Sequence, residues 1–328
     1  MSTDDPLVSI KRSSPDKDKK GPGWIRRDTL RQIWKYRVLY VFILPLVAWF
    51  IIFQYIPMGG NLLAFKDYSF RKGILGSPWA GLRFFRQFFN YYDFWNVTRN
   101  TIVIALMKIL LEFPFPIIFA LLLNELFRTG FKRVVQSLSY LPHFVSWVIV
   151  IQMFTMLLSP TNGVLNSILM GLGIIKEPIF FMGERNLFLP IVFTTDIFKG
   201  IGWSSIIYLS ALSSVNVEVY EAASIDGASR FQKAMHITMP AIIPTAGLLF
   251  ILGFSGILRS GFDQIYLLQS PGNLRVSETL DTIVFKQGIL NGNISYSTAV
   301  GFFQSFISLM LLILVNKIAQ KTGDMSLW

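Results

Sequence analysis

Six apolar stretches, each about 20 residues or longer, constrain the fold of this chain more than any other feature. Their approximate limits are 38–57, 98–126, 134–158, 188–213, 242–262 and 296–317. A helix of this length can cross the hydrocarbon core of a bilayer. Only 15% of the residues are charged, against roughly 25% in soluble domains. The sequence therefore predicts an all-α integral membrane protein with six transmembrane helices.

The two ends of the chain differ from this apolar region. Residues 1–23 are polar and contain no apolar run, which predicts a disordered cytoplasmic tail. Residues 24–37 mix tryptophan and leucine with arginine and lysine, a composition typical of an interfacial helix. No cleavable signal peptide is expected, because the charged leading segment is long. The transmembrane domain is expected over 38–320, followed by a cytoplasmic tail over 321–328.

The distribution of basic residues predicts the orientation. Ten of the 30 lysines and arginines lie in residues 1–37, so both termini are expected on the cytoplasmic side, and the net charge of +11 does not indicate a nucleic-acid partner. The inner segments then also hold Arg128, Lys132, Arg133, Arg230, Lys233, Lys317 and Lys321. The outer segments hold Lys66, Arg71, Lys72, Arg83, Arg86, Lys176, Arg185, Arg275 and Lys286, with Arg99 and Arg259 at their edges.

Enzymatic chemistry has few residues to use in this chain. The sequence contains no cysteine and two histidines, His143 and His236, which argues against a metal site or a catalytic dyad in the membrane. His143 is expected to be a packing residue. The sequence also lacks the Gly-x-x-x-x-Gly-Lys-Ser/Thr loop that cradles phosphate, so any ATP and Mg must be held by partner subunits. A non-catalytic chain without a cofactor of its own is the consequence.

A short polar segment over 215–241 separates the fourth and fifth apolar stretches. Asn216 can cap a helix that begins near Val217, and Gly227 can end it in the left-handed conformation. A second short helix is expected to run from about Ser229 and to stop before Pro240. Such a stiff, protruding pair of helices suits a surface on which a partner pushes. The residues expected to make this contact are Glu221, Ala222, Ala223, Asp226, Gly227, Phe231, Ile237 and Pro240.

The order of residues in this segment, Glu221–Gly227 followed by Ile237–Pro240, resembles the EAA loop of ATP-binding-cassette (ABC) importer permeases. Further stretches are similar to the carbohydrate, maltose-permease-like branch that imports complex oligosaccharides. These stretches are Phe42–Pro45, Tyr55–Met58, Ala64–Tyr68, Tyr140–Phe144 and Trp203–Leu209. The resemblance runs from about residue 38 to 320 and implies the type I importer permease fold.

The same resemblance implies a multisubunit machine in a bacterial inner membrane. A homologous second permease would form a heterodimer with this chain, and two ATPase subunits would dock below on the EAA loops. An extracytoplasmic solute-binding protein would deliver an oligosaccharide, either alginate-derived or another acidic saccharide. Membrane lipid would surround the assembly. Closure of the ATPases would switch the permeases between inward- and outward-facing states.

Ionisable residues inside the expected spans are candidates for a substrate path. Lys108 and Glu112 lie one helical turn apart on the second span, and Asp196 and Lys199 lie three residues apart on the fourth. Trp203 and Tyr208 follow and could offer aromatic platforms to a sugar. Two interpretations remain open: the six residues line a path, or each charged pair neutralises itself and fixes helix packing.

Two further expectations concern the whole molecule. A secondary transporter or channel driven by an ion gradient is the alternative function, although such proteins normally show inverted repeats. The aromatic segment 79–95 is expected to be an amphipathic helix that anchors at the outer interface.

Overall fold

The computed structural model describes residues 34–126, 128–254, 258 and 261–322. The predicted tail 1–23, most of the predicted interfacial helix 24–37 and residues 323–328 lie outside this part of the chain. The fold divides into a unit that ends at Gly59 and a unit that begins at Gly60. Throughout the described ranges the structure is helical, and its β structure is confined to an isolated bridge between Lys66 and Trp79.

The described part of the first unit is one helical run. It comprises α2 (Arg37–Phe50), a π-helical turn (Ile51–Tyr55) and α3 (Ile56–Met58), and its described residues bury no side chain. A helix that is apolar on all sides must be covered by lipid or by another chain. The predicted first span therefore lies in a helix of suitable length and character.

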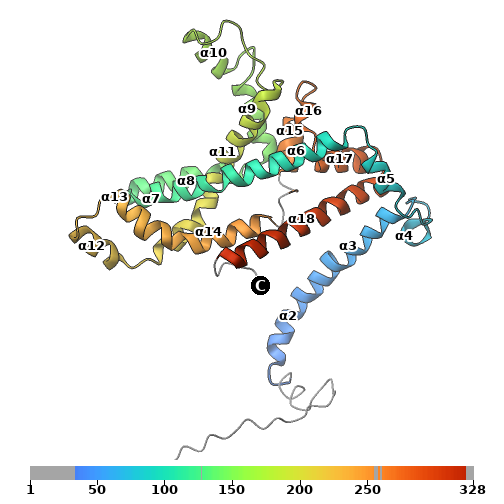
Figure 1. The fold of residues 1–328 in the computed structure, drawn as a ribbon, viewed down its shortest axis with the longest axis horizontal. Coiled ribbons are helices and arrows are strands. Elements are labelled where there is room, and N and C mark those ends of the chain that lie inside the picture. Colours follow the sequence, from blue (N-terminus) through green and yellow to red (C-terminus); the bar gives the residue numbers. More distant parts are fainter. Residues whose placement is uncertain (1–33, 127, 255–257, 259–260, 323–328) are drawn as a thin grey trace, which may run out of the picture. The chain divides into compact units, whose positions relative to one another are not determined.

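The second unit is built around five long helical segments (Figure 1). These are α6 (Phe94–Met107) continued by α7 (Pro114–Asn124), α8 (Thr129–Phe144) with α9 (Trp147–Leu157), α11 (Arg185–Ser213), α13 (Arg230–Lys233) continued by α14 (Met239–Phe254), and α18 (Ile294–Thr322). The shorter elements are α4 (Gly73–Gly76), α5 (Arg83–Phe89), α10 (Val164–Gly171), α12 (Val217–Ile225), α15 (Phe262–Leu268), α16 (Leu274–Ser277) and α17 (Leu280–Phe285).

Contacts between these segments fix their relative directions. Residues near the start of α6 share a cavity with residues near the start of α11, and α7 packs on the later part of α11, so the two run parallel. Lys199 of α11 contacts His143 at the end of α8, and the later Gly202 lies against the earlier Ser139, so α8 is antiparallel to α11. Ile242 at the start of α14 packs near Leu212 at the end of α11, so α14 is antiparallel as well. This alternation is the one expected of successive membrane spans.

The predicted number of six spans is not confirmed in full. Four described helices are long and apolar enough to cross a membrane, or up to five if the bent pair α8–α9 is one span. The helix α11 has 29 residues, about 43 Å, which is sufficient length, but it carries Asp196 and Lys199 near its middle.

The third predicted span is broken, which corrects the single helix expected over 134–158. The helices α8 and α9 meet at an angle of 104°. Val145 and Ser146 adopt extended backbone between them, and the Ser146 side chain accepts a hydrogen bond from the amide of Ile149, which caps α9. Pro142 precedes the break. Proline disfavours a continuous ladder of helical hydrogen bonds, and the cap begins a new helix in a new direction.

The fifth predicted span also starts earlier than expected. The helix after Gly227 does not stop before Pro240 but continues as one 25-residue helix, Arg230–Phe254. A π-helical turn over Ala234–Thr238 immediately precedes α14, whose second residue is Pro240. This wider turn makes room for a ring that would clash with a regular α-helical carbonyl four residues earlier. We refer to Arg230–Phe254 as the α13–α14 helix.

The aromatic segment 79–95 is not a simple surface anchor. Its helix α5 buries Phe84 and Phe88 in a core that includes Phe94, Leu280 and Tyr296. The Phe88 ring lies 4.9 Å from Phe94 and 5.3 Å from Phe303 between centroids. The segments around α17 and α18 cover this face of α5, while Trp79, Tyr92 and Trp95 of the same segment are largely exposed, so its anchoring at the interface stays a prediction.

Candidate functional site

A cluster of charged and polar side chains lies near the middle of the second unit, where α6, α11 and α15 approach one another. The Lys108 Nζ lies 2.7 Å from the Asp196 Oδ2 and 4.0 Å from the Glu112 Oε1. It also donates a hydrogen bond of 2.7 Å to the Gln264 Oε1. We call Lys108, Glu112, Asp196 and Gln264 the buried charge cluster. Its main ion pair joins two helices, whereas the sequence favoured a pair within one helix.

Gln264 is the member of this cluster that sequence reasoning missed. It is fully buried, and its Nε2 donates to the Val192 carbonyl and to the Thr195 Oγ1, both at 2.8 Å. Its amide nitrogen thus provides hydrogen bonds to two oxygen atoms of α11, and its amide oxygen accepts the hydrogen bond from Lys108. Gln264 falls in a region expected to be an outer loop, and no spacing in the sequence connects it with Lys108.

Gly261 fixes the approach of α15 to this cluster. Its φ is +90°, a conformation that side chains other than glycine rarely adopt. A Cβ at this position would lie 2.5 Å from the Lys108 Nζ and 3.2 Å from the Gln264 Oε1. The glycine therefore serves both the turn and the close contact with the ammonium group.

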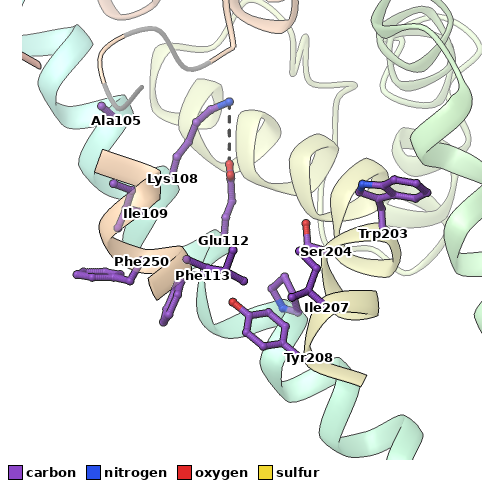
Figure 2. A pocket seen from close by; sticks show the side chains of 13 residues that line it. Ala105, Lys108, Ile109, Glu112, Phe113, Trp203, Ser204, Ile207, Tyr208 and Phe250 are labelled. Atoms are coloured by element: carbon purple, nitrogen blue, oxygen red, sulfur yellow. Dashed lines mark ion pairs between the residues drawn. The ribbon is translucent and has the colours of Figure 1, made fainter. Parts of the chain in front are cut away.

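A cavity of about 460 Å³ adjoins the buried charge cluster. Figure 2 shows Lys108 and Glu112 on one side of it and Trp203, Ser204 and Tyr208 of α11 on the other. The wall is completed by the end of α14, through Leu249, Phe250 and Gly253. Four of the six predicted path residues, Lys108, Glu112, Trp203 and Tyr208, therefore line one space, which we call the mid-bundle cavity. Asp196 and Glu112 line a smaller neighbouring cavity of about 50 Å³.

The aromatic wall of the mid-bundle cavity is held from behind. The ring of Trp203 stacks on His143, with centroids 4.5 Å apart and an angle of 3° between planes. His143 thus packs against the indole, as the sequence predicted. One face of Trp203 is occupied by this stack, while the residue stays 43% exposed, which leaves the other face for a ligand.

Lys199 is engaged elsewhere. Its Nζ donates to the carbonyls of His143 at 2.6 Å and Val145 at 2.5 Å, and more weakly to Pro142 at 3.4 Å. These carbonyls lie at the break between α8 and α9, where the helix can no longer supply amide partners. Of the two open interpretations, neutralisation of Asp196 by Lys199 is not what the structure has: Asp196 pairs with Lys108, and Lys199 donates to carbonyls at the end of α8.

The predicted EAA loop forms two braced helical arms. The Asn216 side chain caps α12 by accepting from the Glu218 amide, and Gly227 follows the helix with a φ of +79°. Ser229 and Gln232 form a capping box at the start of α13. The arms are joined by hydrogen bonds from Tyr220 to Thr238 at 3.0 Å and from Lys233 to Ser224 at 2.6 Å. Both predicted caps are confirmed, and the braces make the loop a stiff unit.

The EAA loop presents apolar side chains to its surroundings. Ile225 is 88% exposed and Phe231 is 74% exposed. Glu221 and Ala222 are also exposed, on α12. A hollow of about 340 Å³ between the arms is lined by Ala223, Asp226, Gly227 and Ile237, among others. Pro240 lies apart from this hollow, inside the α13–α14 helix. An exposed, apolar and rigid surface of this kind is typical of a protein interface.

The loop and the mid-bundle cavity are connected by one element. The α13–α14 helix carries Phe231 near its start and Phe250 near its end, and Phe250 forms part of the cavity wall. No group of three or more His, Asp or Glu side chains within the described ranges could hold a metal ion.

Comparison with known proteins gives concordant results. Residues 112–323 match the family described as binding-protein-dependent transport system inner membrane component. The chain is 42% identical over 283 residues to protein LplB of Bacillus subtilis (strain 168), covering 86% of this chain and 88% of that protein. It is 40% identical to the polygalacturonan/rhamnogalacturonan transport system permease protein YteP of the same organism, covering 91% and 92%.

A solved structure is similar over nearly the same length. It is the crystal structure of a bacterial alginate ABC transporter in complex with an alginate pentasaccharide-bound periplasmic protein. One of its chains superposes with a TM-score of 0.82 at 33% sequence identity, covering 90% of this chain and 99% of that one.

Proposed function

Because this chain belongs to the family of binding-protein-dependent transport system inner membrane components, we propose that it passes an acidic oligosaccharide into the cytoplasm by alternating access. The chain is a sugar ABC transporter permease subunit of an importer, and its relatives are non-catalytic transport permeases. The resemblance expected from the sequence is thereby confirmed. Our proposal adds the identity of the saccharide, the partner subunits and the alternating-access motion.

The observation that carries this proposal is the continuity of the α13–α14 helix. One helix of 25 residues, which includes the π-helical turn Ala234–Thr238, extends from the exposed Phe231 to the wall of the mid-bundle cavity at Phe250. A helix of this length moves as a stiff element on short timescales, so a displacement at one end is transmitted to the other. ATPase subunits that dock on the EAA loop would therefore open and close the cavity.

The acidic character of the substrate is supported by the relatives. The similar permease YteP is named for polygalacturonan and rhamnogalacturonan, and the similar solved transporter is named for alginate. In this proposal a solute-binding protein delivers the saccharide from outside, and a second permease subunit completes the path. The exposed face of Trp203 offers a platform for a sugar ring, and Ser204 and Tyr208 line the same cavity beside it.

Co-purification tests the docking step. The chain is expressed with its partner permease and ATPase subunits, and the amount of ATPase recovered with it is measured. Glu221→Gln should reduce the recovered ATPase several-fold, because the exposed carboxylate orients the docked partner. Glu218→Gln is the matched control: it lies on the same helix and keeps the hydrogen bond that its side chain accepts from Asn216.

Uptake into proteoliposomes tests the energy source. ATP supplied on the side of the EAA loop should drive uptake of an acidic oligosaccharide. Gly227→Ala should uncouple uptake from ATP hydrolysis, because the positive φ at this position is strained for alanine. Uptake that follows a proton or sodium gradient, with no ATPase present, would contradict the proposal.

A further inference from the structure

A second cavity of about 480 Å³ lies at the opposite end of α11 from the EAA loop. Its lining includes three arginines from three different elements, Arg99 of α6, Arg185 of α11 and Arg275 of α16. Asparagines 96, 100 and 186 also line it, and no aspartate or glutamate does. We call this space the three-arginine cavity.

The arginines lack carboxylate partners in the described part of the chain. The ion pairs found there join Arg83 with Asp67, Lys108 with two carboxylates, and Lys286 with Glu278. Of two acidic side chains near the cavity, Glu278 pairs with Lys286 at 2.8 Å, and Asp93 accepts from the neutral Asn96 amide at 3.3 Å. The three arginines thus line one hollow without forming an ion pair within the described ranges.

Hydrogen bonds connect the three elements that carry these exposed arginines. The Nδ2 atoms of Asn96 and Asn100 both donate to the Arg275 carbonyl, at 2.7 and 2.9 Å, and Asn100 also donates to the Glu278 carbonyl at 3.0 Å. Asn100 is only 8% exposed. The Arg185 Nε donates to the Gly272 carbonyl at 3.3 Å. These bonds hold the backbone around α16 against α6 and α11, which keeps the three exposed arginines around one cavity.

The two lysines near the mid-bundle cavity, Lys108 and Lys199, are less available to bind a carboxylate of a ligand. Lys108 lies against Asp196 and donates to Gln264, and Lys199 donates to three carbonyls at the end of α8. A saccharide carboxylate reaching the mid-bundle cavity also meets Glu112. Complementary charge for an acidic ligand is therefore found at the three-arginine cavity, where the planar guanidinium can bind carboxylate through two hydrogen bonds.

We propose that the three-arginine cavity receives the uronate carboxylates of the incoming oligosaccharide before it passes to the mid-bundle cavity. This inference rests on the proposed function, in which the substrate is acidic and arrives at the end of α11 remote from the EAA loop. Because Lys108 is already paired, the arginines select for charge at the outer end, and the mid-bundle cavity then accommodates the sugar rings.

The test uses the assembled transporter in proteoliposomes, with its partner permease, ATPases and binding protein. Oligosaccharides of galacturonate and of mannuronate are the charged probes. Initial rates of ATP-driven uptake are measured over a range of binding-protein concentrations for Arg99→Gln, Arg185→Gln and Arg275→Gln. Arg86→Gln removes the same charge outside the cavity and serves as the matched control.

Each cavity variant should lower the uptake rate at limiting substrate about tenfold, as expected for loss of one charge-assisted pair, with the control unchanged. Basal ATPase activity and the affinity of the empty, substrate-free binding protein for the complex should stay as in wild type. Raised salt should diminish the difference between variants and wild type.

Three results would overturn the inference. Uptake by all three variants at the wild-type rate would show that the arginines do not contact the substrate. Weakened docking of the substrate-free binding protein would identify a protein interface instead, and a defect that disappears in vesicles of neutral lipid would identify a site for anionic headgroups. If the wild-type transporter imports only neutral oligosaccharides, the proposed substrate class fails, and this is seen before any variant is compared.

Discussion

The ammonium of Lys108 lies 2.7 Å from the carboxylate of Asp196, on a different helix, and 4.0 Å from Glu112, one turn away on its own segment. The pair is well buried, with 7% of the Lys108 side chain and 11% of the Asp196 side chain exposed. A buried pair adds little net stability, but removing one partner leaves an uncompensated charge. The link therefore fixes how α6 and α11 stand beside the mid-bundle cavity.

Replacing Lys108 by methionine should therefore lower the stability of the purified complex by about 3 kcal/mol, because Asp196 is left buried without its partner. The double variant Lys108→Met with Asp196→Asn should recover much of this loss. Thermal unfolding of the detergent-solubilised complex measures both. Glu112→Gln is the control, since its side chain is 36% exposed and more distant, and it should change the midpoint little. Equal effects of all three changes would contradict the assignment.

The helices α8 and α11 touch at Gly202. A Cβ at this position would overlap the Ser139 carbonyl, whereas a Cβ at Gly200 would meet nothing within 4 Å. Gly202→Ala should therefore destabilise the complex by about 1–3 kcal/mol through forced separation of the helices. Gly200→Ala should be neutral or slightly stabilising, because alanine is the better helix former. Thermal unfolding distinguishes them, and identical midpoints would exclude the close crossing.

Lys199 should stabilise the break between α8 and α9. In Lys199→Met the carbonyls of His143 and Val145 lose their donor, so amide hydrogen exchange around residues 143–150 should accelerate roughly tenfold. Lys199→Arg retains donors and should exchange nearly as slowly as the wild-type chain. Protection unchanged by the methionine would show that the break is held by other contacts.

The sequence predicts the helical class, the loop and its caps because these depend on local signals. Asn216 and Gly227 lie at fixed offsets from the helix that they delimit, so their roles follow from propensity and backbone preference. The sequence predicts α5 as a helix but not which of its faces is buried, because that face is decided by α17 and α18, which are distant in sequence.

The site was less predictable, for a related reason. Lys108 has a carboxylate one turn away in sequence, and only the packing of α6 on α11 shows that Asp196, on another helix, lies nearer. The contacts of Lys199 arise from the break at Val145, which is hidden within a continuous apolar run. Tertiary packing alone brings Gln264 to Lys108, and it alone brings the three arginines to one cavity.

The central claim is that the α13–α14 helix carries displacement from the EAA loop to the mid-bundle cavity. Replacing both Thr238 and Met239 by glycine should place a flexible point in this helix, since each glycine costs about 0.5–1 kcal/mol relative to alanine. Replacing both by alanine removes the same side chains, including the Thr238 hydroxyl that bonds Tyr220, but keeps the helix stiff.

The decisive measurement is the number of oligosaccharides imported per ATP hydrolysed, in proteoliposomes that contain each variant and equal amounts of bound ATPase. The account predicts that the double-glycine variant hydrolyses ATP but imports at least several-fold less per ATP than the double-alanine variant. Equal import per ATP in the two variants would contradict it.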